Sequence, residues 1–188
     1  MPLYETVAFG FDSAEQIEAT FKGEHLAHTY SRASSPTVEY FELKLKTLTK
    51  SNAVLAVSSG MAAISDTILA VLKTGENFIS GSQLFGHTYS LFSQTLNDLG
   101  IETRFTNLKS ESEIESLIDT NTRAIYFETV TNPQLEVIDI EMLSKIAKKH
   151  QLLLICDSTI TPPNVFNAAK FGVNIEVISA TKYISGGA

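Results

Sequence analysis

The chain has 188 residues, a size typical of one domain, and its 14 basic and 21 acidic residues leave a net charge of −7. Its 44% apolar and 19% charged residues are a globular composition, which argues against disorder. The acidic balance gives no electrostatic reason to bind nucleic acid or a membrane, and the single Cys156 excludes an internal disulfide framework. With no signal-peptide pattern, no membrane-spanning run and no metal-ligand spacing among the four histidines, we expect a cytoplasmic protein without a metal site.

Residues 1–50 differ from the rest of the chain and are predicted to form an arm with two helices, at 13–22 and 37–50. The second helix follows Pro36 and carries apolar residues three or four positions apart, such as Val38, Phe41 and Leu45. The polar loop 28–36 joins the two helices. We expect such an arm to pack on another surface, which in an oligomer can belong to a neighbouring subunit.

From residue 51 onward, short apolar runs alternate with helical patterns, which is typical of an α/β domain with a mostly parallel sheet. Strands are predicted at 54–57, 77–80, 102–105, 124–128, 152–157 and 176–180. Helices are predicted at 61–72, 88–99, 111–119, 140–149 and 163–170. No Gly-x-Gly-x-x-Gly follows a predicted strand, so a dinucleotide-binding domain is the weaker alternative.

Three segments at the ends of predicted strands could carry chemistry. Gly60 opens a helix whose free N–H groups suit an anion, although a plain capped turn explains it equally well. Asp157 ends the most apolar strand and could balance a buried cation, or could cap its own loop with Ser158 or Thr159. Lys182 follows a strand between hydroxyl residues, where the alternative is a solvated surface charge. Because the carboxyl ends of parallel strands meet at one edge, we expect the three segments to converge.

Together these segments resemble the Cys/Met metabolism family of pyridoxal-phosphate enzymes, a group that includes cystathionine γ-synthase. The resemblance runs from about Tyr30 to the last residue and rests on six motifs in family order. They are Tyr30-Ser-Arg32, Ser58-Ser-Gly-Met-Ala-Ala-Ile64, Phe85-Gly-His-Thr88, Glu128-Thr-Val-Thr-Asn-Pro133, Asp157-Ser-Thr-Ile-Thr-Pro162 and Ser179-Ala-Thr-Lys-Tyr-Ile184. It implies an aspartate-aminotransferase-like large domain of pyridoxal-phosphate fold type I over residues 51–188, incomplete after the Schiff-base lysine and lacking a C-terminal domain.

The resemblance also implies roles for particular residues of these motifs. Lys182 forms the Schiff base and moves protons, and Asp157 keeps the pyridine nitrogen protonated. For the cofactor phosphate, the resemblance implies contacts with the amides of Gly60 and Met61 and the hydroxyls of Ser179 and Thr181. It implies that Phe85 lies on the face of the ring. It also implies that Asn132, supported by Glu128, contacts the phenolic oxygen. Tyr30 and Arg32 reach the phosphate in a neighbouring subunit, which implies a homodimer or homotetramer with shared active sites.

Within the family, residues 172–188 are most similar to the O-acetylhomoserine sulfhydrylase branch. The resemblance thus implies a transferase of sulfur amino-acid biosynthesis that converts O-acetylhomoserine and sulfide or a thiol into homocysteine or a thioether and acetate. Cystathionine γ-synthase and methionine or cystathionine γ-lyase are alternatives on the same site. A third is a catalytically silent fragment or assembly module, because family members bind the substrate carboxylate through an arginine of their C-terminal domain.

The chain departs from the family pattern at three places. Phe85 stands where many members have tyrosine, which keeps the stacking face but removes a hydroxyl that lyases are thought to use on the leaving group. Ser35 precedes Pro36 where asparagine is common, and residues 185–188 lack the Gly-Gly-His often found after the lysine. The first departure fits a sulfhydrylase better than a lyase.

Overall fold

The structure is a computed structural model that describes residues 2–186. It divides into two compact units, one ending at Ala56 and the other beginning at Val57. None of the helices within the described residues is long and apolar enough to cross a bilayer.

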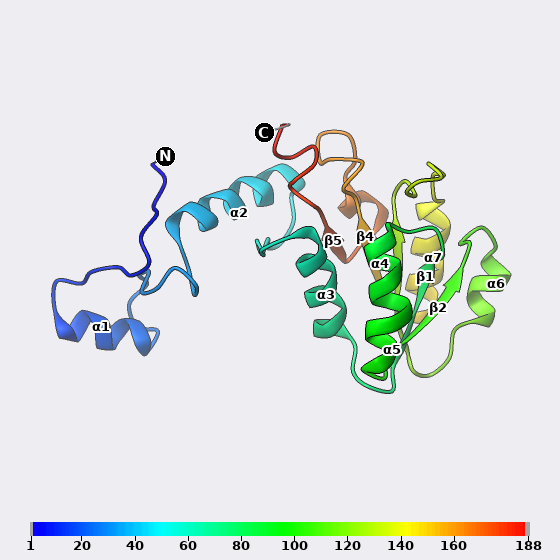
Figure 1. The fold of residues 1–188 in the computed structure, drawn as a ribbon, viewed down its shortest axis with the longest axis horizontal. Coiled ribbons are helices and arrows are strands. Elements are labelled where there is room, and N and C mark those ends of the chain that lie inside the picture. The colour runs from blue at the N-terminus through cyan, green and yellow to red at the C-terminus, as the bar shows by residue number, and fades with distance from the viewer. Residues whose placement is uncertain (1, 187–188) are drawn as a thin grey trace. The chain divides into compact units, whose positions relative to one another are not determined.

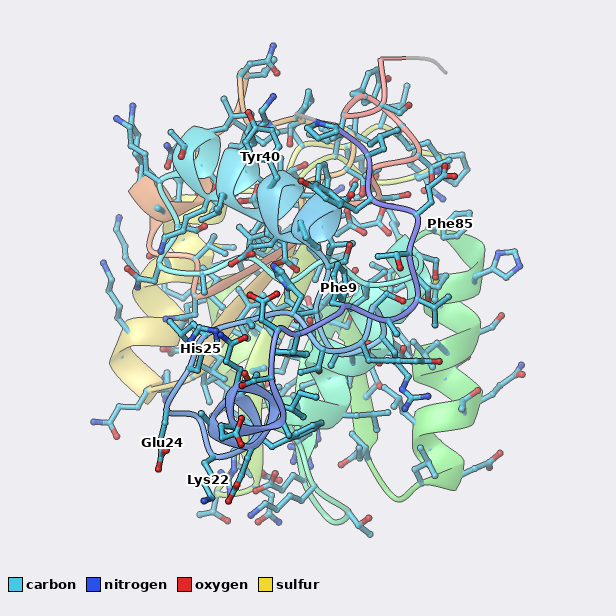
Figure 2. The ribbon with its side chains drawn as sticks, turned by 90° about the vertical axis from the view of Figure 1, so that its left-hand side faces the viewer. Phe9, Lys22, Glu24, His25, Tyr40 and Phe85 are labelled. Carbon is cyan, nitrogen blue, oxygen red and sulfur yellow. The ribbon has the colours of Figure 1, made fainter. Side chains whose placement is uncertain are left out.

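The N-terminal unit contains the two predicted helices, α1 (Ala14–Phe21) and α2 (Pro36–Thr49). Ser13 caps α1 by accepting a hydrogen bond from the Gln16 amide, and Pro36 occupies the first turn of α2, where it needs no N–H partner. Neither helix buries a residue. Figure 2 shows the side chains of this unit, with Lys22, Glu24 and His25 following α1 and Tyr40 on α2.

The second unit is built on a parallel five-stranded sheet of order β2-β1-β3-β4-β5, which confirms the predicted α/β class (Figure 1). The strands are β1 (Asn77–Gly81), β2 (Glu102–Thr106), β3 (Thr122–Glu128), β4 (Leu153–Asp157) and β5 (Ile175–Val177). In the two central strands β3 and β4, residues 124–127 and 154–156 are apolar and fully buried, as expected of strands covered by helices on both sides.

The helices divide into two layers, one on each face of the sheet. One face carries α3 (Gly60–Val71) and a continuous rod, visible in Figure 1, made of α4 (Gly86–Ser90), a π-helical turn at Leu91–Thr95 and α5 (Leu96–Asp98). The other face carries α6 (Glu111–Ser116) and α7 (Ile140–His150). Alternate strand residues face the two layers: Tyr126 and Ile155 pack with α3, whereas Phe127 and Cys156 pack with α7.

Three expected elements differ in the structure. Residues 54–57 form no strand, because the Ala56 amide donates to the Glu42 carboxylate rather than to a neighbouring strand. The strand expected at 176–180 is β5 and ends at Val177, since the Ser179 amide donates to the Thr159 hydroxyl. The helix expected at 163–170 is replaced by turns and a 3₁₀ helix at Ala168–Phe171, because prolines precede it and the Asn167 side chain accepts the Lys170 amide.

Candidate active site

A cavity of about 270 Å³ lies where β3, β4 and β5 end and α3 begins. This is the place where ligands gather in open parallel sheets. Nine residues that the resemblance places in the cofactor site line it: Gly60, Met61, Phe85, Glu128, Asn132, Asp157, Ser179, Thr181 and Lys182. Asp157 and Lys182, the two that matter most for the predicted chemistry, therefore face one shared space.

The start of α3 forms one end of the cavity. Ser59 caps the helix by accepting the Ala62 amide at 3.0 Å. No hydrogen bond occupies the amides of Gly60 and Met61 among residues 2–186, so they remain available to an anion at the positive end of the helix. A Cβ added to Gly60 would lie 2.7 Å from Ser179 Cβ, so glycine is needed for the helix to approach the Ser179 turn this closely.

Asp157 also lines the cavity and occupies the last position of β4. Its Oδ1 accepts the Thr159 amide at 2.9 Å, so the carboxylate does cap its own loop. Burial raises the pKa of Asp157, while hydrogen bonds from Thr159 and the nearby Tyr126 hydroxyl lower it in part. The capping and counter-ion interpretations are therefore compatible, because the capped carboxylate still lines the cavity.

Thr159 links Asp157 to the turn that contains Ser179, whereas its sequence position predicts only a cap for Asp157. Its amide donates to Asp157, and its Oγ1 accepts the Ser179 amide at 2.9 Å. One threonine thus connects the carboxylate at the end of β4 with the hydroxyl turn after β5. The signal for this residue was its position two after Asp157, where a side chain commonly bonds neighbouring backbone.

Glu128 is the registered partner of Asp157 on β3 and is 7% exposed. Its Oε1 accepts the Phe85 amide at 2.8 Å, which holds the start of α4 against the cavity. Burial raises the pKa of Glu128 to about 7, and the nearby charge of Asp157 acts in the same direction. No ion pair links either carboxylate to a basic side chain within the described residues.

The Phe85 ring is 42% exposed, so it is not packed in the core, where a phenylalanine most often lies. It belongs to the cavity lining and precedes α4 (Figure 2). Asn132, also in the lining, precedes a cis peptide bond to Pro133. Tyr30 and Arg32 belong to the N-terminal unit, where the Arg32 guanidinium carbon lies 5.0 Å from the centre of the Tyr30 ring.

These donors suit pyridoxal phosphate. Two free amides and two hydroxyls suit its phosphate, and a buried carboxylate without a basic partner suits its protonated ring nitrogen. An exposed aromatic ring and a lysine lie in the same lining.

The profile of the Cys/Met metabolism PLP-dependent enzyme family matches residues 1–188. The chain belongs to this family. The family's dependence on pyridoxal phosphate confirms the cofactor predicted from the sequence. The roles of the individual site residues remain predictions.

Curated relatives and solved structures agree with the family. The chain is 40% identical over 187 residues to an L-methionine gamma-lyase of Fusobacterium nucleatum and 35% identical over 187 residues to an O-acetyl-L-homoserine sulfhydrylase of Corynebacterium glutamicum. These matches cover 99% of the chain but only 47% and 43% of the two relatives. The chain therefore spans about half the length of the curated relatives it matches.

A solved Campylobacter jejuni protein described as an O-acetylhomoserine (thiol)-lyase has a TM-score of 0.92 and 36% identity to the chain. The match covers 99% of this chain and 46% of that one, whose structure contains N′-pyridoxyl-lysine-5′-monophosphate. The predicted pyridoxal-phosphate fold type I is thereby confirmed.

Proposed function

We propose that the protein containing this chain catalyses γ-replacement, in which sulfide or a thiol displaces acetate from O-acetylhomoserine and yields homocysteine or a thioether. Phe85 is the observation that favours γ-replacement over γ-cleavage, because its ring lines the cavity without a hydroxyl that could protonate a leaving group. Acetate leaves without a proton, since carboxylic acids have a pKa of about 4. A thiolate leaves poorly without one, since thiols have a pKa of about 8.5.

The proposed roles follow the chemistry of the residues that line the cavity. Bound pyridoxal phosphate supplies an electron-withdrawing ring that makes the substrate Cα–H bond acidic enough to break at neutral pH. The Lys182 amine holds the cofactor aldehyde in the resting protein and afterwards accepts the Cα proton. Asp157 pairs with the protonated ring nitrogen, and Asn132 orients the ring through its phenolic oxygen. The contacts proposed for the phosphate are the Gly60 and Met61 amides and the Ser179 and Thr181 hydroxyls.

The second candidate is γ-cleavage of methionine or cystathionine, which the 40% identity to a methionine gamma-lyase favours. In that reaction the leaving group is a thiol, and a residue other than Phe85 must protonate it.

A substrate comparison tests the choice. Purified protein is supplied with O-acetylhomoserine and sulfide, with methionine, or with cystathionine, and acetate, homocysteine and released thiol are measured separately. We expect acetate and homocysteine in equal amounts and little thiol from methionine. Faster thiol release from methionine than acetate release would establish the lyase instead.

Trapping with borohydride tests the cofactor site itself. Reduction in the presence of pyridoxal phosphate should fix a pyridoxyl group on the peptide that contains Lys182, and mass spectrometry locates it. Lys182→Ala should lose both the adduct and the yellow absorbance of pyridoxal phosphate bound to the lysine. An adduct on another lysine would reassign the role.

We also propose that the active site is shared between two copies of the protein. Tyr30 and Arg32 provide a hydroxyl and a guanidinium fork, which is a strong combination for a phosphate. The resemblance assigns both to the cofactor of the neighbouring subunit.

A further inference from the structure

The hydroxyl of Tyr126 is the one buried side-chain polar atom without a hydrogen-bond partner among residues 2–186. The residue is fully buried on β3, and its ring is fixed by an edge contact with Phe92, with centroids 4.9 Å apart at 86°. Phe92 in turn makes an edge contact with Phe78. An unpaired buried hydroxyl is unfavourable, so its presence in a tightly packed core calls for an explanation.

Strand register places this hydroxyl beside Asp157. Tyr126 pairs with Ile155 on β4, so Asp157, two residues further along, lies on the same face of the sheet as Tyr126. Such a diagonal pair is separated by about 7–8 Å between backbones, a distance that a tyrosine side chain spans. Glu128 lies on the same face and is the registered partner of Asp157. Tyr126 therefore reaches toward two carboxylates from the core side, while both also line the cavity.

The surroundings keep the Tyr126 phenol protonated. Burial raises its pKa well above the ordinary value, and the charges of Asp157 and Glu128 raise it further. A phenol in this state has a hydrogen to donate, and a carboxylate is the acceptor beside it.

We propose that Tyr126 is a positioning residue that donates its hydroxyl hydrogen to the Asp157 carboxylate from the core side and keeps that carboxylate charged and aimed at the cofactor ring nitrogen. The inference rests on the proposed role of Asp157 as partner of that nitrogen. It explains why a polar tip is retained at the centre of an aromatic cluster, where phenylalanine would fill the same space.

Asp157 needs such a donor because most of its charged neighbours oppose its ionisation. Glu128 faces it from β3 and Glu176 from β5, and the pKa of each is raised in part by the charge of Asp157. Lys182, in the same cavity lining after β5, is the basic group facing this space, and α3 contributes none of the charged lining residues. A protonated Asp157 could not pair with a protonated ring nitrogen, so each hydrogen bond to its charged form matters.

The test compares Tyr126→Phe with wild-type protein, using the affinity for pyridoxal phosphate measured by absorbance from about pH 6 to about pH 9. We expect about tenfold weaker binding near neutral pH, as for loss of one hydrogen bond to a charged group. The difference should narrow as the pH rises, because Asp157 then ionises without help. Tyr89→Phe is the matched control, since Tyr89 is 45% exposed and makes a tilted ring contact with Phe105, and it should leave the affinity unchanged.

A double-mutant cycle identifies the residue through which Tyr126 acts. In an Asp157→Asn background, Tyr126→Phe should have no further effect on cofactor affinity. An equal loss in both backgrounds, or no loss in either, would overturn the inference.

A measurement without cofactor separates this inference from the proposed function. The pKa of the Asp157 carboxyl, followed by NMR in cofactor-free protein, should move upward in Tyr126→Phe. An unchanged pKa would contradict the role of Tyr126, whereas failure of wild-type protein to bind pyridoxal phosphate would contradict the proposed function alone. The melting temperature should stay close to wild type, because phenylalanine fills the same space in the aromatic cluster.

Discussion

At Gly60, the backbone of α3 approaches Ser179 too closely for any side chain to fit between them. Gly60→Ala would place a Cβ 2.7 Å from Ser179 Cβ, and the Ser179 turn would have to move. We expect a loss of about 1–3 kcal/mol in unfolding free energy from overpacking, together with clearly weaker binding of pyridoxal phosphate. Urea unfolding and an absorbance titration measure the two effects.

Gly86→Ala is the matched control for this substitution. Gly86 also stands at the first position of a helix, but a Cβ there meets nothing within 4 Å. We expect its stability to stay within about 0.5 kcal/mol of wild type and its cofactor affinity to be unchanged. If the two alanine variants bound the cofactor equally, the close approach at Gly60 would have no part in binding.

Glu128 should make the folded protein less stable as the pH rises, whereas a carboxylate whose pKa is lowered by folding has the opposite effect. Its pKa of about 7 exceeds the ordinary 4.5, so between these values the folded protein holds a proton that the unfolded chain has released. The free energy of unfolding should therefore fall as pH rises through this window, by at most about 3 kcal/mol, and then level off.

Glu128→Gln isolates this contribution, because its amide oxygen can still accept the Phe85 amide. Asp157 and Glu176 also have raised pKa values and act in the same direction, so some of the slope should remain in the variant. Urea unfolding of both proteins at about pH 5 and about pH 8 measures the difference between them. Parallel pH profiles would show that Glu128 ionises like an exposed carboxylate.

At the scale of the element, the start of α3 supplies the proposed phosphate site, and its cap keeps that site formed. Ser59→Ala removes the acceptor of the Ala62 amide and should cost about 1 kcal/mol of stability. We expect weaker cofactor binding as well, because a frayed first turn no longer aims the Gly60 and Met61 amides.

Ser110→Ala provides the comparison at a second helix. Ser110 caps α6 in the same way, by accepting the Glu113 amide at 3.3 Å, but lies outside the cavity lining. We expect a similar loss of stability and no change in cofactor affinity. Equal effects of the two variants on binding would refute a specific role of the α3 terminus.

The elements that could be predicted from the sequence are those whose own residues determine them. The core strands were found because apolar residues such as Leu154 and Ile155 must be buried wherever they lie, and α7 was found from its periodicity. Residues 54–57 were wrongly predicted as a strand because strand formation needs a neighbour, and the pattern cannot show that Glu42 takes the Ala56 amide instead.

In the candidate site, too, residues with a local sequence signal could be predicted, and those that depend on distant contacts could not. Asp157 and Lys182 could be predicted from their positions after strands and from their motifs. Tyr126 could not, because it resembles any apolar strand residue, and its importance depends on the register that sets it diagonally across from Asp157. Thr159 bonds one neighbour in the sequence and one twenty residues away, and only the first of these can be read locally.

At the scale of the whole molecule, the N-terminal unit lacks an apolar core of its own. Between residues 2 and 56, Ser35 is the one buried residue, whereas Leu3, Phe21 and Leu26 are 76%, 76% and 95% exposed. A unit of this size is stable only if it buries much of its apolar surface. We expect residues 1–56 alone to be largely unfolded by circular dichroism, and a cooperative thermal transition in that fragment would contradict this.

Exposed apolar side chains in this unit are consistent with a partner that covers them, and the proposed shared site makes that partner a second copy.

Complementation between two inactive variants tests the shared site directly. Arg32→Ala removes the proposed phosphate contact, and Lys182→Ala removes the amine, so each variant alone should have little activity. If Arg32 serves the neighbouring subunit, a mixed dimer contains one site that receives Lys182 from one chain and Arg32 from the other. Random exchange in a two-fold dimer then restores roughly a quarter of the sites. Activity that appears on mixing and subunit exchange, measured as acetate release, supports the shared site. If instead both residues serve the same chain, mixing restores nothing, however completely the subunits exchange.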